Sequence, residues 1–398
     1  MAIQPVIIAA KRTPIGRFMG GLSTTPSPQL GAHAAKAVLD EAPQIKDHID
    51  ECVMGCVLQA GLGQNPARQV GLKAGLPDTL SAKTINKVCG SGLESVMMAA
   101  QSIKAGDNHA VLAGGIENMS MAPHFVHARA GIKYGAGQLE DHMAYDGLRC
   151  AFECWAMGNG ADHIAEKFGI SREEQDRFAA QSHQRAAKAA SEGWFNTETV
   201  ALTGEQVGNR KNPGPEGGVS ADEGIRPDSS AEVLAKLRPA FNKNGTVTAG
   251  NASQISDGAA AILVASSTKA EELGLSPMAK IVGYHTSGVA PKEIFAAPIT
   301  GVGGLLKKIG WSADEVDLFE INEAFAAQVL CNIKELGIGE DRLNICGGGV
   351  ALGHPIGASG ARVLTTLLHQ LKRTGGKKGV AALCLGGGNA VAMAVELV

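Results

Sequence analysis

Two cysteines of this chain stand beside runs of glycine, and a histidine stands in a third such run. Cys89 is followed by Gly-Ser-Gly, Cys384 by Leu and three glycines, and His354 lies within the segment 353–357. Glycine turns at the ends of apolar runs are places where a fold exposes a reactive side chain beside bare backbone N–H groups. Two thiols and an imidazole in such places indicate covalent thioester chemistry.

The thiol of Cys89 is a candidate nucleophile. Apolar residues follow it with helical spacing from Leu93 to Ile103, and a thiol near a helix N-terminus has a lowered pKa because the backbone dipoles stabilise its anion. A small buried residue at a tight turn is the alternative. A nucleophilic thiol needs a base, and His354 could supply it from its glycine-rich loop. A purely structural loop histidine is the alternative there.

Cys384 and Asn322 extend the candidate set. A second reactive thiol at Cys384 suits proton transfer at a carbon acid, since a thiol can titrate near the working pH. Asn322 follows the apolar run 316–321, so it should emerge at a strand end, where open α/β sheets bind ligands. There it could orient a water or donate to an oxyanion, or it could cap a helix. Cys346, the counterpart of Cys89 in the repeat described below, is a reserve nucleophile.

The composition excludes several classes of protein. With 36 basic and 39 acidic residues and a net charge of -3, the chain has no global positive field that would hold nucleic acid or an anionic membrane surface. No apolar run approaches the roughly 20 residues that span a bilayer, and the start of the chain lacks the features of a secretory signal. We therefore expect a cytoplasmic protein that binds neither nucleic acid nor membranes.

The eight cysteines are not expected to form a disulfide framework in a long intracellular chain. Two pairs, Cys52 with Cys56 and Cys150 with Cys154, have i, i+4 spacing, but no second pair of ligands completes a zinc pattern. We expect no bound metal, and we expect most of these thiols to be buried.

An internal repeat predicts the architecture. Residues 85–92 resemble residues 343–349, and each segment is followed by a helix-like stretch and then by a glycine-ended strand, at 110–115 in the first copy and at 381–387 in the second. Two matches in the same order favour a duplicated α/β unit. Strands that alternate with helices predict parallel pairing and one layered α/β/α unit in each copy.

The composition shifts between the two copies. Residues 121–245 are richer in charge and in helix, with a capping box at Ser171 that leads into a long amphipathic helix, so this stretch is interpreted as an insertion. Its segment 208–218 is a turn-rich loop that we expect on the surface. Regular structure is expected to resume at 246–250, and a helix is expected over 257–265.

Four motifs occur together: Cys-Gly-Ser-Gly at 89–92, Asn-Glu-Ala-Phe at 322–325, Gly-His-Pro at 353–355 and Cys-Leu-Gly-Gly-Gly at 384–388. In this order they resemble the active-site motifs of the thiolases, and the similarity extends across nearly the whole chain. The resemblance implies a thiolase-like α/β fold of duplicated layered α/β/α units, five layers (αβαβα) in all, with an inserted loop domain.

The resemblance also implies a division into domains and an assembly. The N-terminal half would cover 1–120 and continue over about 246–274, the inserted CoA-binding loop domain would cover 121–245, and the C-terminal half would cover 275–398. The segment 123–146 resembles the protruding loop that joins dimers into tetramers in short-chain thiolases. A homotetramer is therefore expected, with a homodimer as the minimum.

For the reaction, the resemblance implies a role for each motif residue. Cys89 would accept the acyl group and His354 would activate it, while Cys384 would remove a proton from the methyl group of the incoming acetyl-CoA. Asn322 would position a water that forms one oxyanion hole together with His354. The second hole would consist of the backbone N–H groups of Cys89 and Gly386, which the neighbouring glycines leave unobstructed.

Four further residues would contact coenzyme A if the resemblance holds. Arg226 would border the adenine end and Ser253 would meet the pantetheine chain, while Met157 and Phe325 would line its apolar walls. A solvated loop charge, a cap and ordinary core side chains are the alternatives for these residues.

The expected activity is acyl transfer that interconverts two acetyl-CoA with acetoacetyl-CoA plus CoA, with these thioesters as substrates and no cofactor. Two departures from the family pattern leave the acyl chain length open. Ala156 stands where acetoacetyl-CoA thiolases often have histidine, and Cys346 stands where many members have asparagine. A broader 3-ketoacyl-CoA thiolase of fatty-acid β-oxidation is the nearest alternative, and a non-catalytic thiolase-like protein that binds acyl-CoA is a more distant one.

Overall fold

The computed structural model describes residues 3–208 and 212–398. Within these residues, ten strands form one sheet, and its path runs β4-β3-β5-β8-β1 in the N-terminal half and β9-β12-β11-β10 in the C-terminal half, with β2 beside β8. The halves meet where β1 pairs with β9. These strands are β1 (Pro5–Arg12), β2 (Gly16–Arg17), β3 (Glu51–Gly55), β4 (Ser81–Ile85), β5 (Ala110–Asn118), β8 (Ser256–Ser266), β9 (Ala279–Gly288), β10 (Leu318–Ile321), β11 (Lys378–Leu385) and β12 (Asn389–Leu397).

The two halves repeat one topology, as the sequence predicts. In the first half β3 is parallel to β4 and to β5, β5 is antiparallel to β8, and β8 is antiparallel to β1. In the second half β10 is parallel to β11, β11 is antiparallel to β12, and β12 is antiparallel to β9. A parallel bridge between Phe319 and Leu343 stands where β4 pairs with β3 in the first copy. The fold is therefore duplicated.

The predicted parallel pairing is confirmed for β3 with β4 and β5 and for β10 with β11, whereas β8 and β12 return antiparallel beside β5 and β11, so the sheet is mixed. Two other expectations are wrong. The predicted helix over 257–265 is the strand β8, and residues 246–250 form a loop without regular structure. Every residue of β8 is buried. A strand covered on both faces has a continuous apolar sequence, which periodicity cannot distinguish from a buried helix.

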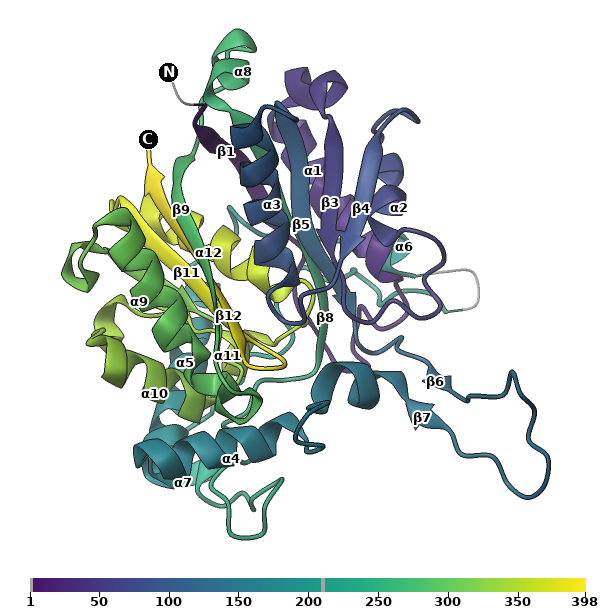
Figure 1. Cartoon of the computed structure of the whole chain (residues 1–398), viewed down its shortest axis with the longest axis vertical. Helices are drawn as coiled ribbons and strands as arrows, with labels where there is room; N and C mark the ends of the chain where they lie inside the picture. The colour runs from purple at the N-terminus through teal and green to yellow at the C-terminus, as the bar shows by residue number, and fades with distance from the viewer. Residues whose placement is uncertain (1–2, 209–211) are drawn as a thin grey trace.

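Helices complete five layers (Figure 1). α1 (Ser27–Glu41) and α2 (Pro66–Lys73) cover the outer face of the N-terminal half, and α9 (Ala297–Ile309) and α10 (Ala326–Leu336) cover the outer face of the C-terminal half. Between the two halves lie α3 (Ser91–Ala105) and α12 (Ser359–Thr374), whose apolar residues share one core with strands of both halves. The layer order α-β-α-β-α is the predicted one.

The central helices α3 and α12 touch through glycines. A methyl group on Gly92 would lie 2.7 Å from the backbone nitrogen of Ala361, and one on Gly360 would collide with the backbone nitrogen of Leu93. The N-terminal turns of both helices can therefore approach more closely than any residue with a Cβ would permit. Because Cys89 and His354 precede these two helices, the contact helps to set the distance between their loops.

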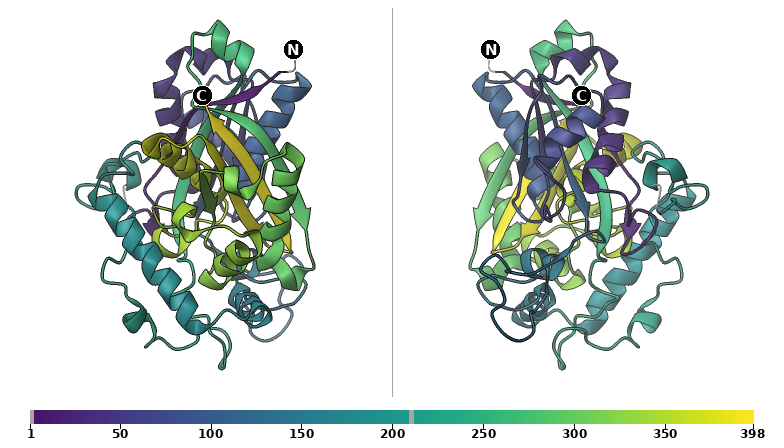
Figure 2. Two further views of the ribbon diagram at one scale, coloured as in Figure 1. Left: turned by 90° about the vertical axis from the view of Figure 1, so that its left-hand side faces the viewer. Right: turned by 90° about the vertical axis from the view of Figure 1, so that its right-hand side faces the viewer.

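The insertion lies at the end of the sheet layers opposite the two termini (Figures 1 and 2). It includes α4 (Met157–Phe168) and the long α5 (Arg172–Ser191), which begins with the predicted capping box between Ser171 and Glu174. The short strands β6 (His124–Phe125) and β7 (Glu140–Asp141) begin an arm that projects away from the body (Figure 1). Of the predicted surface loop 208–218, residues 209–211 lie outside the described residues.

The remaining elements are short. The helices are α6 (Gly204–Val207), α7 (Ala231–Leu234), α8 (Ser267–Glu272) and α11 (Gly349–Leu352), with 3-10 turns at Pro43–His48, Pro291–Ala296, Ala313–Glu315 and Glu340–Arg342 and a π-helical turn at Met143–Leu148. Among the residues that the structure describes, no helix has the length and apolarity needed to cross a membrane. All eight cysteines are free thiols, as expected.

Candidate active site

A cavity of about 850 Å³ contains most of the predicted site residues. Its lining comes from both halves of the fold and from the insertion. Eight of the nine predicted residues line it, namely Cys89, His354, Cys384, Gly386, Arg226, Ser253, Met157 and Phe325. Asn322 is fully buried behind the lining, where it contacts His354.

Cys89 sits at a strained turn just before α3. The preceding residue, Val88, has φ of +47°, a left-handed conformation that is a marked outlier for a β-branched side chain and is typical of functional sites. Side chains hold the turn: Asn86 Oδ1 accepts from the Val88 N–H at 2.9 Å, and the Ser91 hydroxyl donates to the Val88 carbonyl at 2.7 Å. The turn presents the Cys89 thiol to the cavity.

The thiol of Cys89 is not a preformed thiolate. The backbone N–H groups of Cys89 and Gly386 favour the anion and act to lower its pKa, but burial outweighs them and raises the thiol pKa to about 12. The expectation of a lowered pKa at the helix N-terminus is therefore wrong, because desolvation disfavours the charged form more strongly than these donors stabilise it. A neutral Cys89 needs a base when it reacts.

His354 has the protonation state of a base. The Ser359 hydroxyl lies 2.9 Å from the Pro355 carbonyl and 2.5 Å from Nδ1 of His354. We assign its proton to the carbonyl, which can only accept, so that its oxygen accepts the proton on Nδ1. Nε2 then carries the lone pair. Burial, with the positive charge of Arg362 as a second cause, lowers the imidazole pKa to about 3. His354 is consequently neutral near pH 7.

Cys384 lies near the end of β11, and its side chain is buried. Burial raises its thiol pKa well above the ordinary value, and the neighbouring Cys89 raises it further. The two cysteines come from opposite halves and line the same cavity, and both are protonated near pH 7.

Asn322 follows β10 directly, at the predicted strand end. Its Nδ2 lies 3.4 Å from Nε2 and 3.5 Å from Nδ1 of His354. The cap of the following helix α10 is Phe325, so the alternative role of Asn322 as that helix's cap does not apply. Since Asn322 does not line the cavity, its contact with the site runs through His354.

The predicted CoA residues line the same cavity as the cysteines. The ring of Phe325 packs edge-to-face on Phe241 and Phe295, at centroid distances of 6.2 and 5.1 Å. Ser253 donates its backbone N–H to the Ala324 carbonyl at 3.0 Å, which places it beside the Asn-Glu-Ala-Phe motif. The cavity thus combines an apolar wall with a few polar groups, the usual character of a small-molecule site.

Sequence reasoning missed two residues that hold the catalytic loops. Ser359 orients the ring of His354, as described above. Glu117, at the end of β5, accepts backbone N–H groups from Val57 at 3.1 Å, Leu58 at 3.2 Å and Gly357 at 2.9 Å. It links the loop after β3 to the loop of His354. A carboxylate in an otherwise apolar strand sequence was the signal that could have identified it.

Two family models together match nearly the whole chain. The model of the thiolase N-terminal domain matches residues 5–268, and that of the thiolase C-terminal domain matches residues 275–397. The chain belongs to the thiolase family. These ranges do not separate an insertion, so the predicted division of this thiolase into 1–120 with 246–274, 121–245 and 275–398 stays a prediction.

This thiolase has similar relatives over its full length. It is 52% identical to the acetyl-CoA acetyltransferase of Chromobacterium violaceum over 395 residues, which cover 99% of this chain and 100% of that protein. It is 49% identical to the acetyl-CoA acetyltransferase of Pseudomonas aeruginosa, over 98% of each chain. The crystal structure of the Bacillus anthracis acetyl-CoA acetyltransferase matches with a TM-score of 0.96 at 40% identity, over 100% of this chain and 99% of that one.

Proposed function

We propose that this thiolase is an acetyl-CoA C-acetyltransferase, which interconverts two acetyl-CoA with acetoacetyl-CoA plus CoA. The observation that carries the proposal is the cavity in which Cys89 and His354 meet Cys384. A nucleophile with a base accounts for acyl transfer, and a second thiol accounts for the proton transfer at carbon. The names of the full-length relatives agree with this activity.

In the first half-reaction Cys89 attacks the thioester carbonyl while its proton passes to Nε2 of His354. The backbone N–H groups of Cys89 and Gly386, which favour negative charge at the Cys89 sulfur, would stabilise the oxyanion of the tetrahedral intermediate. When the intermediate collapses, the carbon–sulfur bond to CoA breaks and His354 returns the proton to the departing CoA sulfur. The acetyl group remains on Cys89.

In the second half-reaction the raised pKa of Cys384 suits proton transfer with a carbon acid. A thiol that stays protonated can give its proton to the carbanion that forms in thiolysis. In the reverse direction Cys384 first gives its proton to the neutral His354, and its thiolate, a strong base because of that pKa, takes the methyl proton of the second acetyl-CoA. Asn322, through a water and His354, would stabilise the resulting enolate, whose carbon then attacks the acetyl group on Cys89. The carbon–sulfur bond to Cys89 breaks, and His354 returns the proton to the Cys89 sulfur.

Substrate comparison tests the proposal. Thiolysis of acetoacetyl-CoA is expected to exceed that of 3-ketooctanoyl-CoA in kcat/KM. A marked preference for the longer substrate would instead assign the broader 3-ketoacyl-CoA thiolase activity. Mass spectrometry after incubation with acetyl-CoA should detect an acetyl group on Cys89, and its absence would support a non-catalytic acyl-CoA-binding protein.

We infer further that CoA thioesters are the substrates, that no cofactor or metal takes part, and that the protein acts in the cytoplasm. The arm 123–146 exposes Ile132, Leu139 and a wholly accessible Tyr134, which suits contact with a second dimer in a homotetramer. Light scattering should give the mass of four chains, and deletion of the arm should reduce it to the mass of two.

A further inference from the structure

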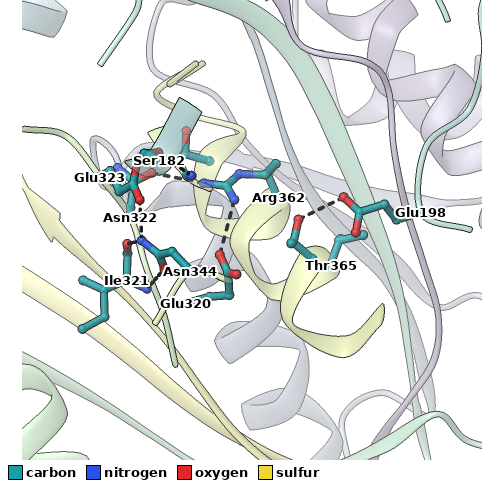
Figure 3. A network of polar contacts seen from close by, with 12 residues as sticks. Ser182, Glu198, Glu320, Ile321, Asn322, Glu323, Asn344, Arg362 and Thr365 are labelled. Atoms are coloured by element: carbon teal, nitrogen blue, oxygen red, sulfur yellow. Dashed lines mark hydrogen bonds and ion pairs between the residues drawn. The ribbon is translucent and has the colours of Figure 1, made fainter. Parts of the chain in front are cut away.

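The amide of Asn322 contacts both the catalytic imidazole of His354 and the buried guanidinium of Arg362. Figure 3 shows Asn322 beside Arg362. The Nδ2 of Asn322 faces His354 at 3.4 Å. Its Oδ1 lies 3.5 Å from Nη2 of Arg362, which belongs to the first turns of α12. Because α12 also carries Ser359, one helix contacts both polar partners in this part of the site.

The backbone beside Asn322 is held by a separate set of contacts. The side chain of Asn344 accepts from the Ile321 N–H at 3.0 Å and donates to its carbonyl at 2.8 Å. The carboxylate of Glu323 accepts from Asn344 at 2.9 Å and from Ser182 at 2.7 Å. These contacts place the chain on both sides of Asn322 (Figure 3). They leave the orientation of its own amide undecided, so another group must determine it.

Arg362 is that group, because a guanidinium can only donate hydrogen bonds. The amide atom that faces Arg362 must therefore be Oδ1, and the N–H donor must face His354. This constraint matters most when His354 is protonated during turnover. An imidazolium would favour the reversed amide, whose Oδ1 would accept its proton, and the N–H donor toward His354 would be lost.

Stability does not explain why Arg362 is buried. Its side chain is only 2% exposed, and its ion pair with Glu320 spans 3.6 Å between Nη1 and Oε2. Among the described residues, Nε and Nη1 of Arg362 and Oε2 of Glu320 have no hydrogen-bond partner. A loosely paired buried charge of this kind costs free energy compared with apolar residues of similar volume. Arg362 is therefore expected to serve the site.

We propose that Arg362 is a positioning residue that fixes the amide of Asn322 with its N–H donor toward His354 throughout the reaction. The proposal rests on the acyl-transfer function above and concerns the enolate step. Acylation of Cys89 uses the N–H groups of Cys89 and Gly386 and does not require Asn322. Loss of Arg362 should therefore separate the two steps.

The test compares Arg362→Met with Thr365→Val in the full-length enzyme. Thr365 is buried in the same helix and donates to the Ala361 carbonyl at 2.9 Å, so its variant is a control for a shape-conserving change in α12. Arg362→Met should lower kcat for acetoacetyl-CoA thiolysis about tenfold or more, the order of effect expected for an impaired oxyanion donor. Acetylation of Cys89 by acetyl-CoA should stay within about twofold of the control.

A double-mutant cycle separates positioning from a structural role. In the Asn322→Ala background, Arg362→Met should cause little further loss, since the amide that it positions is already absent. Equal losses of acylation and thiolysis, or the same loss in both backgrounds, would overturn the proposal. If Arg362→Met does not fold, Arg362→Lys keeps a positive charge beside Glu320 with a shorter donor, and the same cycle applies. A wild type that neither thiolyses acetoacetyl-CoA nor acetylates Cys89 would overturn both proposals.

Discussion

The backbone N–H of Gly386 lowers the pKa of the Cys89 thiol and both residues line one cavity, although they belong to opposite halves of the duplicated fold. A side chain at Gly386 would be tight, because its Cβ would lie 3.0 Å from Cγ1 of Val88. The acyl-accepting centre is thus assembled only when the halves pack together. A glycine is required on one side and a strained turn on the other.

Replacement of each of the two cysteines should impair a different step of the reaction. Cys89→Ala should abolish acetylation of the enzyme, because Cys89 is the thiol assigned to accept the acyl group, whereas Cys384 is assigned to proton transfer. Cys384→Ala should retain acetylation at Cys89 but lose condensation by about a hundredfold or more, since the proton-transfer group at carbon is absent. Intact-mass spectrometry and a condensation assay measure the two steps. Equal loss of both in Cys384→Ala would contradict the assigned roles.

The raised pKa of the Cys89 thiol predicts how the free enzyme reacts with iodoacetamide. Because burial keeps the thiol protonated, the rate of alkylation at Cys89 should rise continuously with pH between about pH 7 and pH 10. Inactivation kinetics with peptide mapping would measure it, and mapping excludes the exposed Cys154. A plateau that is already reached below neutral pH would instead indicate a thiolate paired with protonated His354.

Glu117 should make the folded enzyme less stable as pH rises. Burial raises its pKa to about 7, so between its ordinary pKa and about 7 the folded state binds more protons than the unfolded state. Its contribution to the free energy of unfolding is therefore complete below the ordinary pKa. As the pH rises through about 7, this contribution is lost, which lowers the free energy of unfolding by about 3 kcal/mol. Urea unfolding at pH 4.5 and pH 8 should show a smaller change in Glu117→Gln than in the wild type. Identical pH dependence of the two proteins would refute this origin.

Gly360→Ala should destabilise the protein and lower its activity. The new methyl would collide with the backbone nitrogen of Leu93 and push α12 from α3, so a loss of about 2 kcal/mol is expected from overpacking. Gly303→Ala in α9 is the matched control, because nothing lies within 4 Å of its added Cβ. That change should be neutral or stabilising by up to about 1 kcal/mol. Thermal unfolding of both variants measures the difference, and equal effects would argue against helix contact as the cause.

Much of the fold was predictable because short sequence patterns indicate it. The repeat anticipated the duplication, and the capping box at Ser171 marked the start of α5. The strand β8 was mistaken for a helix because both of its faces are buried, which removes the alternation that identifies a strand. Antiparallel return strands such as β12 also escaped prediction, since strand direction depends on how distant segments pair.

The sequence by itself determined which residues could do the chemistry, because Cys89, His354 and Cys384 are reactive residue types that stand beside glycine. Only the tertiary structure decided their state: burial, which has no local signature, keeps both thiols protonated and the imidazole neutral. The tertiary structure also decided which side chains contact and support the site residues. Arg362 reaches Asn322 only because α12 packs between the two halves, and such approaches of distant segments follow from packing and not from any short motif.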